Sequence, residues 1–131
     1  MPSTIFEIPI RTISEANCSQ HWTKKSKRHK QQQLFVRLAY AKYVNGLILP
    51  CIVTMTRLAP RILDDDNLCS AFKWIRDELS ESMLPDKSAT YVARNGKLKK
   101  LKGRADSDER ITWKYSQEKN TTYGVRIVIE F

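Results

Sequence analysis

The sequence predicts a single α+β domain, in which a small mixed sheet of about four strands packs against two main helices. A chain of 131 residues with 41% hydrophobic content is sufficient for one moderate core and does not require a second domain. Segments of alternating polarity occur at both ends of the chain, and two segments between them carry apolar residues at helical spacing. The predicted order is strand, helix, strand, helix, loop, strand, strand, within one domain from residue 1 to residue 131.

The first half of the chain is expected to contain a strand, a long helix and a second strand. Residues 4–13 alternate apolar and polar side chains, and Pro9 limits this strand to a sheet edge or an irregular position. The helix that follows has apolar side chains at helical spacing, namely Leu34, Phe35, Leu38 and Ala41. Residues 47–60 are rich in β-branched and apolar side chains, which predicts a largely buried strand.

The second half begins with the clearest helical pattern, over residues 66–82. Its apolar side chains fall at i, i+4, i+7 and i+11 and so lie on one face: Leu68, Phe72, Ile75 and Leu79. The stretch at about 83–106 has no periodicity and many basic residues, which predicts a mobile basic loop. Two alternating segments close the chain on either side of residues 120–124, and this pattern predicts a β-hairpin.

The net charge is +9, with 23 lysines and arginines against 14 acidic residues. This imbalance favours nucleic acid as the partner, with a ribosomal-type or membrane-surface protein as the alternative. No apolar run can cross a bilayer and no secretory signal begins the chain, so we expect a cytoplasmic protein with no membrane partner. Two basic stretches are the expected DNA contacts, although a solvated charge is the alternative for each residue: Lys24, Lys25, Lys27, Arg28 and Lys30, then Lys97, Lys99, Lys100, Lys102 and Arg104.

Three consecutive aspartates, Asp64 to Asp66, interrupt this positive background at the start of the second helix. One aspartate is explained as a helix cap, but three adjacent carboxylates repel one another unless a cation lies among them. Two or three converging carboxylates are sufficient for magnesium, which can activate water against a phosphodiester. A second acidic group, with Asp106 and Asp108, precedes the next strand and would meet the first if that strand lay beside the end of strand 47–60. A solvated turn is the alternative there.

The second helix also carries a polar stripe opposite its apolar face, formed by Asp66, Ser70, Lys73 and Asp77. Lys73 is the candidate for binding a phosphate oxygen beside a metal ion. For Asp77, a surface ion pair with Lys73 is the better interpretation, because the two stand four residues apart.

These motifs resemble the signature of the RusA-like Holliday junction resolvases of phages and prophages. The similarity lies in "LDDDNLCSAFKWIRDEL", "DSDERITWKYSQEK" and "ISEANCSQHWTKKSKRHKQ", and it extends from about residue 14 to the end of the chain. By position, Asp64 and Asp66 match the paired aspartates of the family, Asn67 its asparagine, Lys73 its helix lysine, and Asp108 its third catalytic aspartate. Two departures leave alternatives open. Lys73 stands further along the helix than in the best-known members, and a longer loop leaves Asp106 as an alternative to Asp108.

The resemblance implies a homodimeric, magnesium-dependent endonuclease, with manganese as a substitute, encoded by a bacterium or a phage. Such an enzyme resolves four-way junctions or related branched DNA by paired symmetric nicks, in DNA recombination and repair. The residues alone leave two other hypotheses open. In one, the chain is a non-catalytic nucleic-acid-binding module whose aspartates only cap a helix. In the other, it is a basic protein that binds an acidic protein partner.

Overall fold

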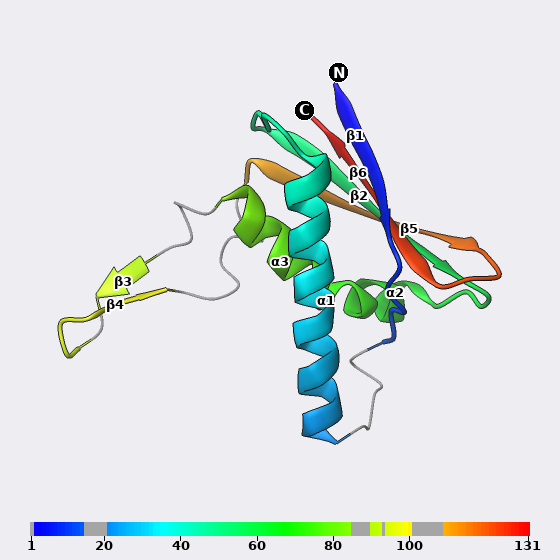
Figure 1. The fold of residues 1–131 in the computed structure, drawn as a ribbon, viewed down its shortest axis with the longest axis horizontal. Coiled ribbons are helices and arrows are strands. Elements are labelled where there is room, and N and C mark those ends of the chain that lie inside the picture. Colours follow the sequence, from blue (N-terminus) through cyan, green and yellow to red (C-terminus); the bar gives the residue numbers. More distant parts are fainter. Residues whose placement is uncertain (1, 15–20, 85–89, 93, 101–108) are drawn as a thin grey trace.

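A four-stranded mixed sheet forms the centre of the molecule (Figure 1). Its strands are β1 (Ser3–Ile8), β2 (Cys51–Ala59), β5 (Ile111–Lys119) and β6 (Gly124–Glu130), in the order β1-β6-β2-β5. β6 runs antiparallel to β1 and β2, whereas β5 runs parallel to β2. The computed structural model describes residues 2–14, 21–84, 90–92, 94–100 and 109–131, with the backbone alone for 90–92 and 98–100. The predicted fold class, a single small α+β domain, is confirmed.

β2 is the most deeply buried of these four strands, and it lies inside the sheet. Its last five residues, Met55–Ala59, are all buried, so that both faces of the strand are covered at this end. β6, next to it, alternates and places Val125, Ile127 and Ile129 in the core. β1 lies at an edge of the sheet, as Pro9 predicts, and ends at Ile8 directly before that proline.

The prediction of a hairpin between β5 and β6 is wrong. β2 lies between the two strands and pairs with both of them, so residues 120–123 pass across the end of β2. The alternating pattern identifies a strand but does not identify its neighbour. Because every residue near the end of β2 is buried, this strand is best placed in the interior of the sheet, where strands cover both of its edges.

Within the described ranges, three helices accompany the sheet: α1 (Trp22–Tyr43), α2 (Asp65–Ala71) and α3 (Lys73–Met83). The predicted helix 66–82 is therefore two helices, which meet at Phe72, where the backbone has φ −96° and ψ 0°. Its predicted apolar face is confirmed, because its four side chains are at most 5% exposed: Leu68, Phe72, Ile75 and Leu79. Among the described residues, none of the helices combines the length and the apolar character that crossing a membrane requires.

The apolar side chains that predicted α1 are not its buried face. Leu34 and Leu38 are 49% and 58% exposed, whereas Gln32 and Val36 are buried. α1 packs against α3 and the edge strand β1, and it crosses in front of the sheet (Figure 1). The residues that face these neighbours are offset along the helix from those that the hydrophobic pattern selects.

Part of the stretch predicted as a loop forms a second, two-stranded sheet of β3 (Thr90–Val92) and β4 (Leu98–Lys100). The turn between them contains Gly96 at a φ of 79°, a backbone conformation that glycine adopts without strain. Of the second basic stretch, Lys97 is exposed in this turn, and Lys99 and Lys100 lie on β4. Lys102 and Arg104 lie outside the described residues.

Candidate functional site

The acidic triplet, Asp64 to Asp66, lies at the N-terminus of α2, and all three aspartates are exposed. Asp64 is the helix cap, because its Oδ1 accepts a hydrogen bond of 2.9 Å from the backbone N–H of Asn67. Asp65 and Asp66 occupy the first turn, where the positive end of the helix dipole favours carboxylates. Capping thus accounts for one carboxylate oxygen of the triplet.

A side chain of β5 holds the residue directly before the triplet. The Gln117 Nε2 donates to the backbone carbonyl of Leu63 at 2.7 Å, and the Gln117 Oε1 accepts from the backbone N–H of Leu63 at 3.0 Å. The amide side chain therefore satisfies both backbone groups of Leu63, as a neighbouring strand would. Because β5 pairs with β2 along its whole length, this contact ties the position of Asp64 to the central sheet.

A buried arginine holds the other side of the same loop. Arg57 on β2 is 6% exposed, and its Nη1 donates to the backbone carbonyl of Arg61 at 2.7 Å. Its Nε donates to the Oγ1 of Thr12, which is also buried, at 3.1 Å. Burial lowers the pKa of Arg57 from its ordinary value. The side chain therefore links β2 to the turn that follows it and to the segment after β1.

The segment after β1, residues 9–14, reaches α2 at Asn67. The Ser14 hydroxyl donates a hydrogen bond to the Oδ1 of Asn67. The same segment also lies against α1, because Pro9, Ile10 and Ile13 line a cavity together with side chains of that helix. Residues 9–14 therefore join the acidic triplet to the basic helix α1.

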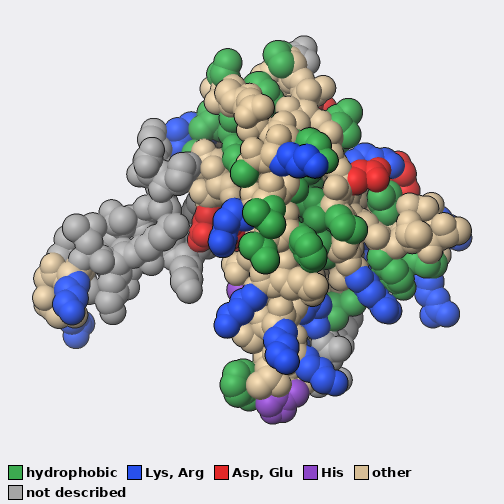
Figure 2. Space-filling model, viewed as in Figure 1, with side chains coloured by type: hydrophobic (Ala, Val, Ile, Leu, Met, Phe, Trp, Pro, Cys, Tyr) green, Lys and Arg blue, Asp and Glu red, His purple; other side chains and the backbone are tan. Residues whose placement is uncertain are grey.

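The N-terminal part of α1 is a positively charged projection. It carries the first basic stretch, none of residues 22–31 is buried, and its first turn holds no acidic residue. These turns extend beyond the sheet in Figure 1, and Figure 2 shows Lys and Arg side chains gathered around this end. Positive charges beside the positive end of a helix dipole cost stability. A bound polyanion would reverse that cost.

Lys73 lies in a groove of about 570 Å³ between α1 and α3. The ring of His29 stacks on Trp74 in this groove, with centroids 4.4 Å apart, and Arg37 Nε binds Glu78 Oε1 at 2.8 Å. Asp77 lines the same groove as Lys73, as their spacing predicts. Of the described residues that line the groove, none belongs to the acidic triplet.

The second acidic group begins outside the described residues, which include neither Asp106 nor Asp108. Glu109 is exposed and precedes β5, where Ile111 pairs with Cys51 at the start of β2. The start of β5 therefore lies beside the start of β2, whereas the triplet follows the end of β2, so Glu109 and the triplet lie toward opposite ends of these two paired strands. Gln117, which holds the triplet, is about 20 Å further along β5 at about 3.3 Å per residue.

The donor set of the triplet fits a hard divalent cation. Within the described residues, no group of three or more His, Cys, Asp or Glu side chains could hold a metal ion. Magnesium, however, keeps several waters and binds through as few as one or two carboxylates. The exposed carboxylates of Asp64 and Asp66 supply such ligands.

The residues that position the triplet were not among the predicted site residues. Arg57 carried a detectable signal, because it is the one charged residue in the apolar stretch 47–60. Gln117 carried a weaker signal, because it is polar on the β5 face that Trp113 and Tyr115 share. Thr12 and Ser14 carried none, since polar residues are ordinary in a connecting segment.

Comparisons of the chain with protein-family models, curated proteins and solved structures find no match. The function of this chain is therefore inferred from its motifs and its geometry.

Proposed function

We propose that the chain is a magnesium-dependent endonuclease that cuts branched DNA, as its resemblance to the RusA-like resolvases implies. One observation carries the proposal. An exposed acidic triplet is held in place by Arg57 and Gln117, and residues 9–14 connect it to a strongly basic helix. Carboxylates for a metal and cations for phosphates are the two groups that phosphodiester hydrolysis requires on one surface.

In this proposal, each matched residue has a role. Asp64 and Asp66 hold magnesium or manganese. Asp108, or Asp106 in its place, matches the third carboxylate of the family, and both lie outside the described residues. When bound, the ion supplies a polarised phosphoryl oxygen and a water of lowered pKa. Lys73 binds a phosphate oxygen, and Asn67, which Ser14 holds, contacts the DNA beside the triplet.

The basic stretches hold the DNA by its phosphates. On α1, phosphates would replace the repulsion among the basic side chains and the helix dipole with attraction. The second stretch, on β4 and around it, would hold another arm of the branch. Binding of this kind weakens steeply with salt and depends on DNA shape more than on sequence.

A homodimer is part of the proposal, because a four-way junction has twofold symmetry and paired nicks require two symmetry-related sites. Figure 2 shows hydrophobic side chains over the middle of α1, where Leu34 and Leu38 are about half exposed. Sedimentation equilibrium should therefore show a dimer that Leu38→Glu weakens. Ile48→Glu, at a side chain that is 68% exposed outside α1, should leave it intact. The proposed setting is DNA recombination and repair in the cytoplasm of a bacterium, with the protein encoded by the host or a phage.

The deciding experiment is cleavage of a labelled four-way junction beside a linear duplex, with magnesium, with manganese and with a chelator. We expect symmetric nicks in the junction that require the metal. Asp66→Asn should reduce cutting by more than about 100-fold, because loss of even an outer partner of a metal costs about 10–100-fold. Asp65→Asn is the matched control, because this neighbouring aspartate is not one of the matched pair.

The capping hydrogen bond of Asp64 favours a second candidate, a binding module without catalysis. In that case the triplet stabilises α2 and repels unsuitable partners. Junctions would remain uncut in either metal, and Asp66→Asn would leave binding unchanged or stronger, with no effect of the metal. That combination of results would contradict the endonuclease.

A further inference from the structure

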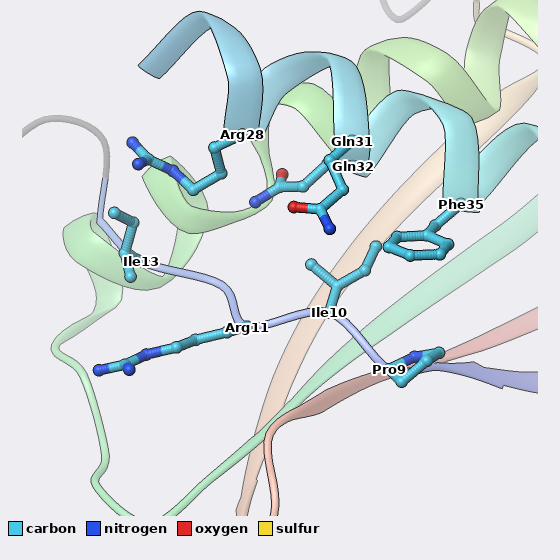
Figure 3. Close-up of a pocket in the computed structure, with 8 residues that line it drawn as sticks. All are labelled: Pro9, Ile10, Arg11, Ile13, Arg28, Gln31, Gln32 and Phe35. Atoms are coloured by element: carbon cyan, nitrogen blue, oxygen red, sulfur yellow. The ribbon is translucent and has the colours of Figure 1, made fainter. Parts of the chain in front are cut away.

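A cavity of about 500 Å³ lies between α1 and the segment after β1 (Figure 3). Its volume is in the range of about 300–1,000 Å³ that is typical of small-ligand sites. Ile10 and Phe35 provide apolar walls, and the side chains of Gln31 and Gln32 extend from α1, that of Gln32 above Ile10 and that of Gln31 nearer to Arg28 (Figure 3). Arg11 and Arg28 also line it. The cavity thus combines apolar surface, amide groups and positive charge.

Gln32 is the unusual member of this lining. Its side chain is in the core, with the residue 3% exposed, yet its Nε2 has no hydrogen-bond partner among the described residues. In Figure 3 this amide is directed from α1 toward Ile10. A buried donor without an acceptor costs stability. A donor that opens into a cavity can bind an acceptor that arrives with a ligand.

The charge of the cavity selects an anion. Arg11 and Arg28 are its charged members, and none of the described lining residues is acidic. Each guanidinium is placed over an aromatic ring, Arg11 over Tyr123 at 4.6 Å and Arg28 over Trp74 at 5.6 Å. The two rings lie outside the cavity lining, and Figure 3 shows both guanidinium groups at the end of the cavity near Ile13, away from Phe35. Guanidinium groups held in this way suit phosphate.

We propose that the cavity takes up one unpaired nucleotide of a DNA strand, with its base beside Gln32 and its phosphate at Arg11 and Arg28. Side-chain amides pair with the donors and acceptors of a base edge, and a ring such as Phe35 can contact a base face. The inference rests on the proposed function, because it takes DNA as the source of the nucleotide.

The cavity is connected to the acidic triplet through residues 13 and 14. Ile13 lines the cavity, and its neighbour Ser14 binds Asn67 beside the acidic triplet. A base held between α1 and residues 9–13 brings the adjoining phosphodiester toward the triplet. The cavity is then a specificity determinant, which selects by base the nucleotide held next to the site of cutting.

The test is an amide NMR titration of the full chain in metal-free buffer, which requires no cleavage. The probes are the four deoxynucleoside 5′-monophosphates and inorganic phosphate, followed by two single-stranded oligonucleotides that differ only by one central base or an abasic spacer. Gln32→Leu removes the buried amide at similar volume. Gln33→Leu is the matched control, because the neighbouring Gln33 lines the groove between α1 and α3 instead.

We expect one monophosphate to shift the side-chain amide signal of Gln32 and to bind about tenfold more tightly than inorganic phosphate. The oligonucleotide with the preferred base should likewise bind about tenfold more tightly than the abasic one. Gln32→Leu should remove both preferences, and Gln33→Leu should keep them. Since the Gln32 donor has no partner to lose, Gln32→Leu should also unfold at the same or a higher temperature. If that variant does not fold, Gln32→Met makes the same comparison, because it removes the same amide with a more flexible apolar side chain.

Three outcomes would overturn the inference. Equal effects of inorganic phosphate and all four monophosphates would make the cavity an anion site alone. Monophosphate binding without discrimination between the oligonucleotides would make free nucleotides the ligand. Base preferences that survive Gln32→Leu would place the base elsewhere. Failure of the proposed endonuclease function can be told apart from failure of this inference. A chain that never cuts DNA can still show the base preference, and a chain that cuts junctions can lack it.

Discussion

Gln117→Ala should lower the free energy of unfolding by about 2 kcal/mol. The substitution removes two hydrogen bonds to the backbone of Leu63, of 2.7 Å and 3.0 Å. Each neutral hydrogen bond contributes about 0.5–1.5 kcal/mol, and both residues are partly buried, so water replaces the lost partner only in part. The loop before the acidic triplet would lose its contact with β5 while the sheet itself stays paired.

The assay is urea unfolding followed by circular dichroism, together with hydrogen exchange of the Leu63 amide. A loss of about 2 kcal/mol corresponds to a melting point lower by roughly 5–10 °C in a chain of this size. Exchange at Leu63 should accelerate in Gln117→Ala, whereas amides in the middle of β2 should not change. Ser116→Ala is the matched control, because its exposed side chain is adjacent on β5, and its effect should stay within about 0.5 kcal/mol.

If Gln117→Ala unfolds like Ser116→Ala and the Leu63 amide exchanges at its original rate, the sheet does not hold the loop, and the reasoning about the triplet fails. If the loop is released, the proposed endonuclease should lose cutting more than it loses junction binding. The reason is that the proposed metal ligands follow directly after Leu63, whereas the basic stretches lie on other elements.

Three further measurements follow from the structure. Burial raises the pKa of the Cys51 thiol, and burial together with Cys51 raises that of the Tyr40 hydroxyl. The native state therefore keeps these two protons to a higher pH than the unfolded state does, and the free energy of unfolding should be constant below about pH 9 and fall as the pH rises further. The fall should be smaller in Tyr40→Phe. Equal slopes of the free energy of unfolding against pH for the two proteins, measured by urea unfolding, would refute this. Arg37→Met should lower the free energy of unfolding at pH 7 by about 1–2 kcal/mol, because it leaves the buried carboxylate of Glu78 without this partner. The 63% exposure of the Arg37 side chain keeps the value this small. An unchanged free energy would show that water replaces the ion pair. Lys25→Ala should reduce the slope of log affinity for DNA against log salt by about 1, and an unchanged slope would remove Lys25 from the phosphate contacts.

The faces of α2 and α3 were predictable from the sequence, whereas the order of the strands was not. Leu68, Phe72, Ile75 and Leu79 share a face because local helical geometry places them there, whatever the rest of the chain does. The neighbour of β5 depends instead on competition among distant strands. β2 lies beside it and is buried on both faces near its end, and alternation within β5 does not contain that information.

Part of the candidate site was likewise predictable from the sequence, and part was not. The triplet was visible because three carboxylates contrast with a basic chain, and its capping role follows from local helix chemistry. Its supports were not visible, because they join residues separated by 45, 53 and 54 positions: Arg57 with Thr12, Ser14 with Asn67, and Leu63 with Gln117. Contacts of this range are a property of the completed fold.

These supports also bear on why the triplet is where it is. A buried polar network is an inefficient source of stability, since well-packed apolar residues of similar volume often stabilise a fold as much or more. Arg57, Gln117 and Ser14 come from three different parts of the chain, yet all bind within the short stretch from Arg61 to Asn67 or to the segment that contacts it. A helix cap alone does not require such support, because a cap at an exposed helix end is formed locally. The convergence of three polar side chains is expected where the position of the carboxylates themselves matters, as it does for a metal ligand.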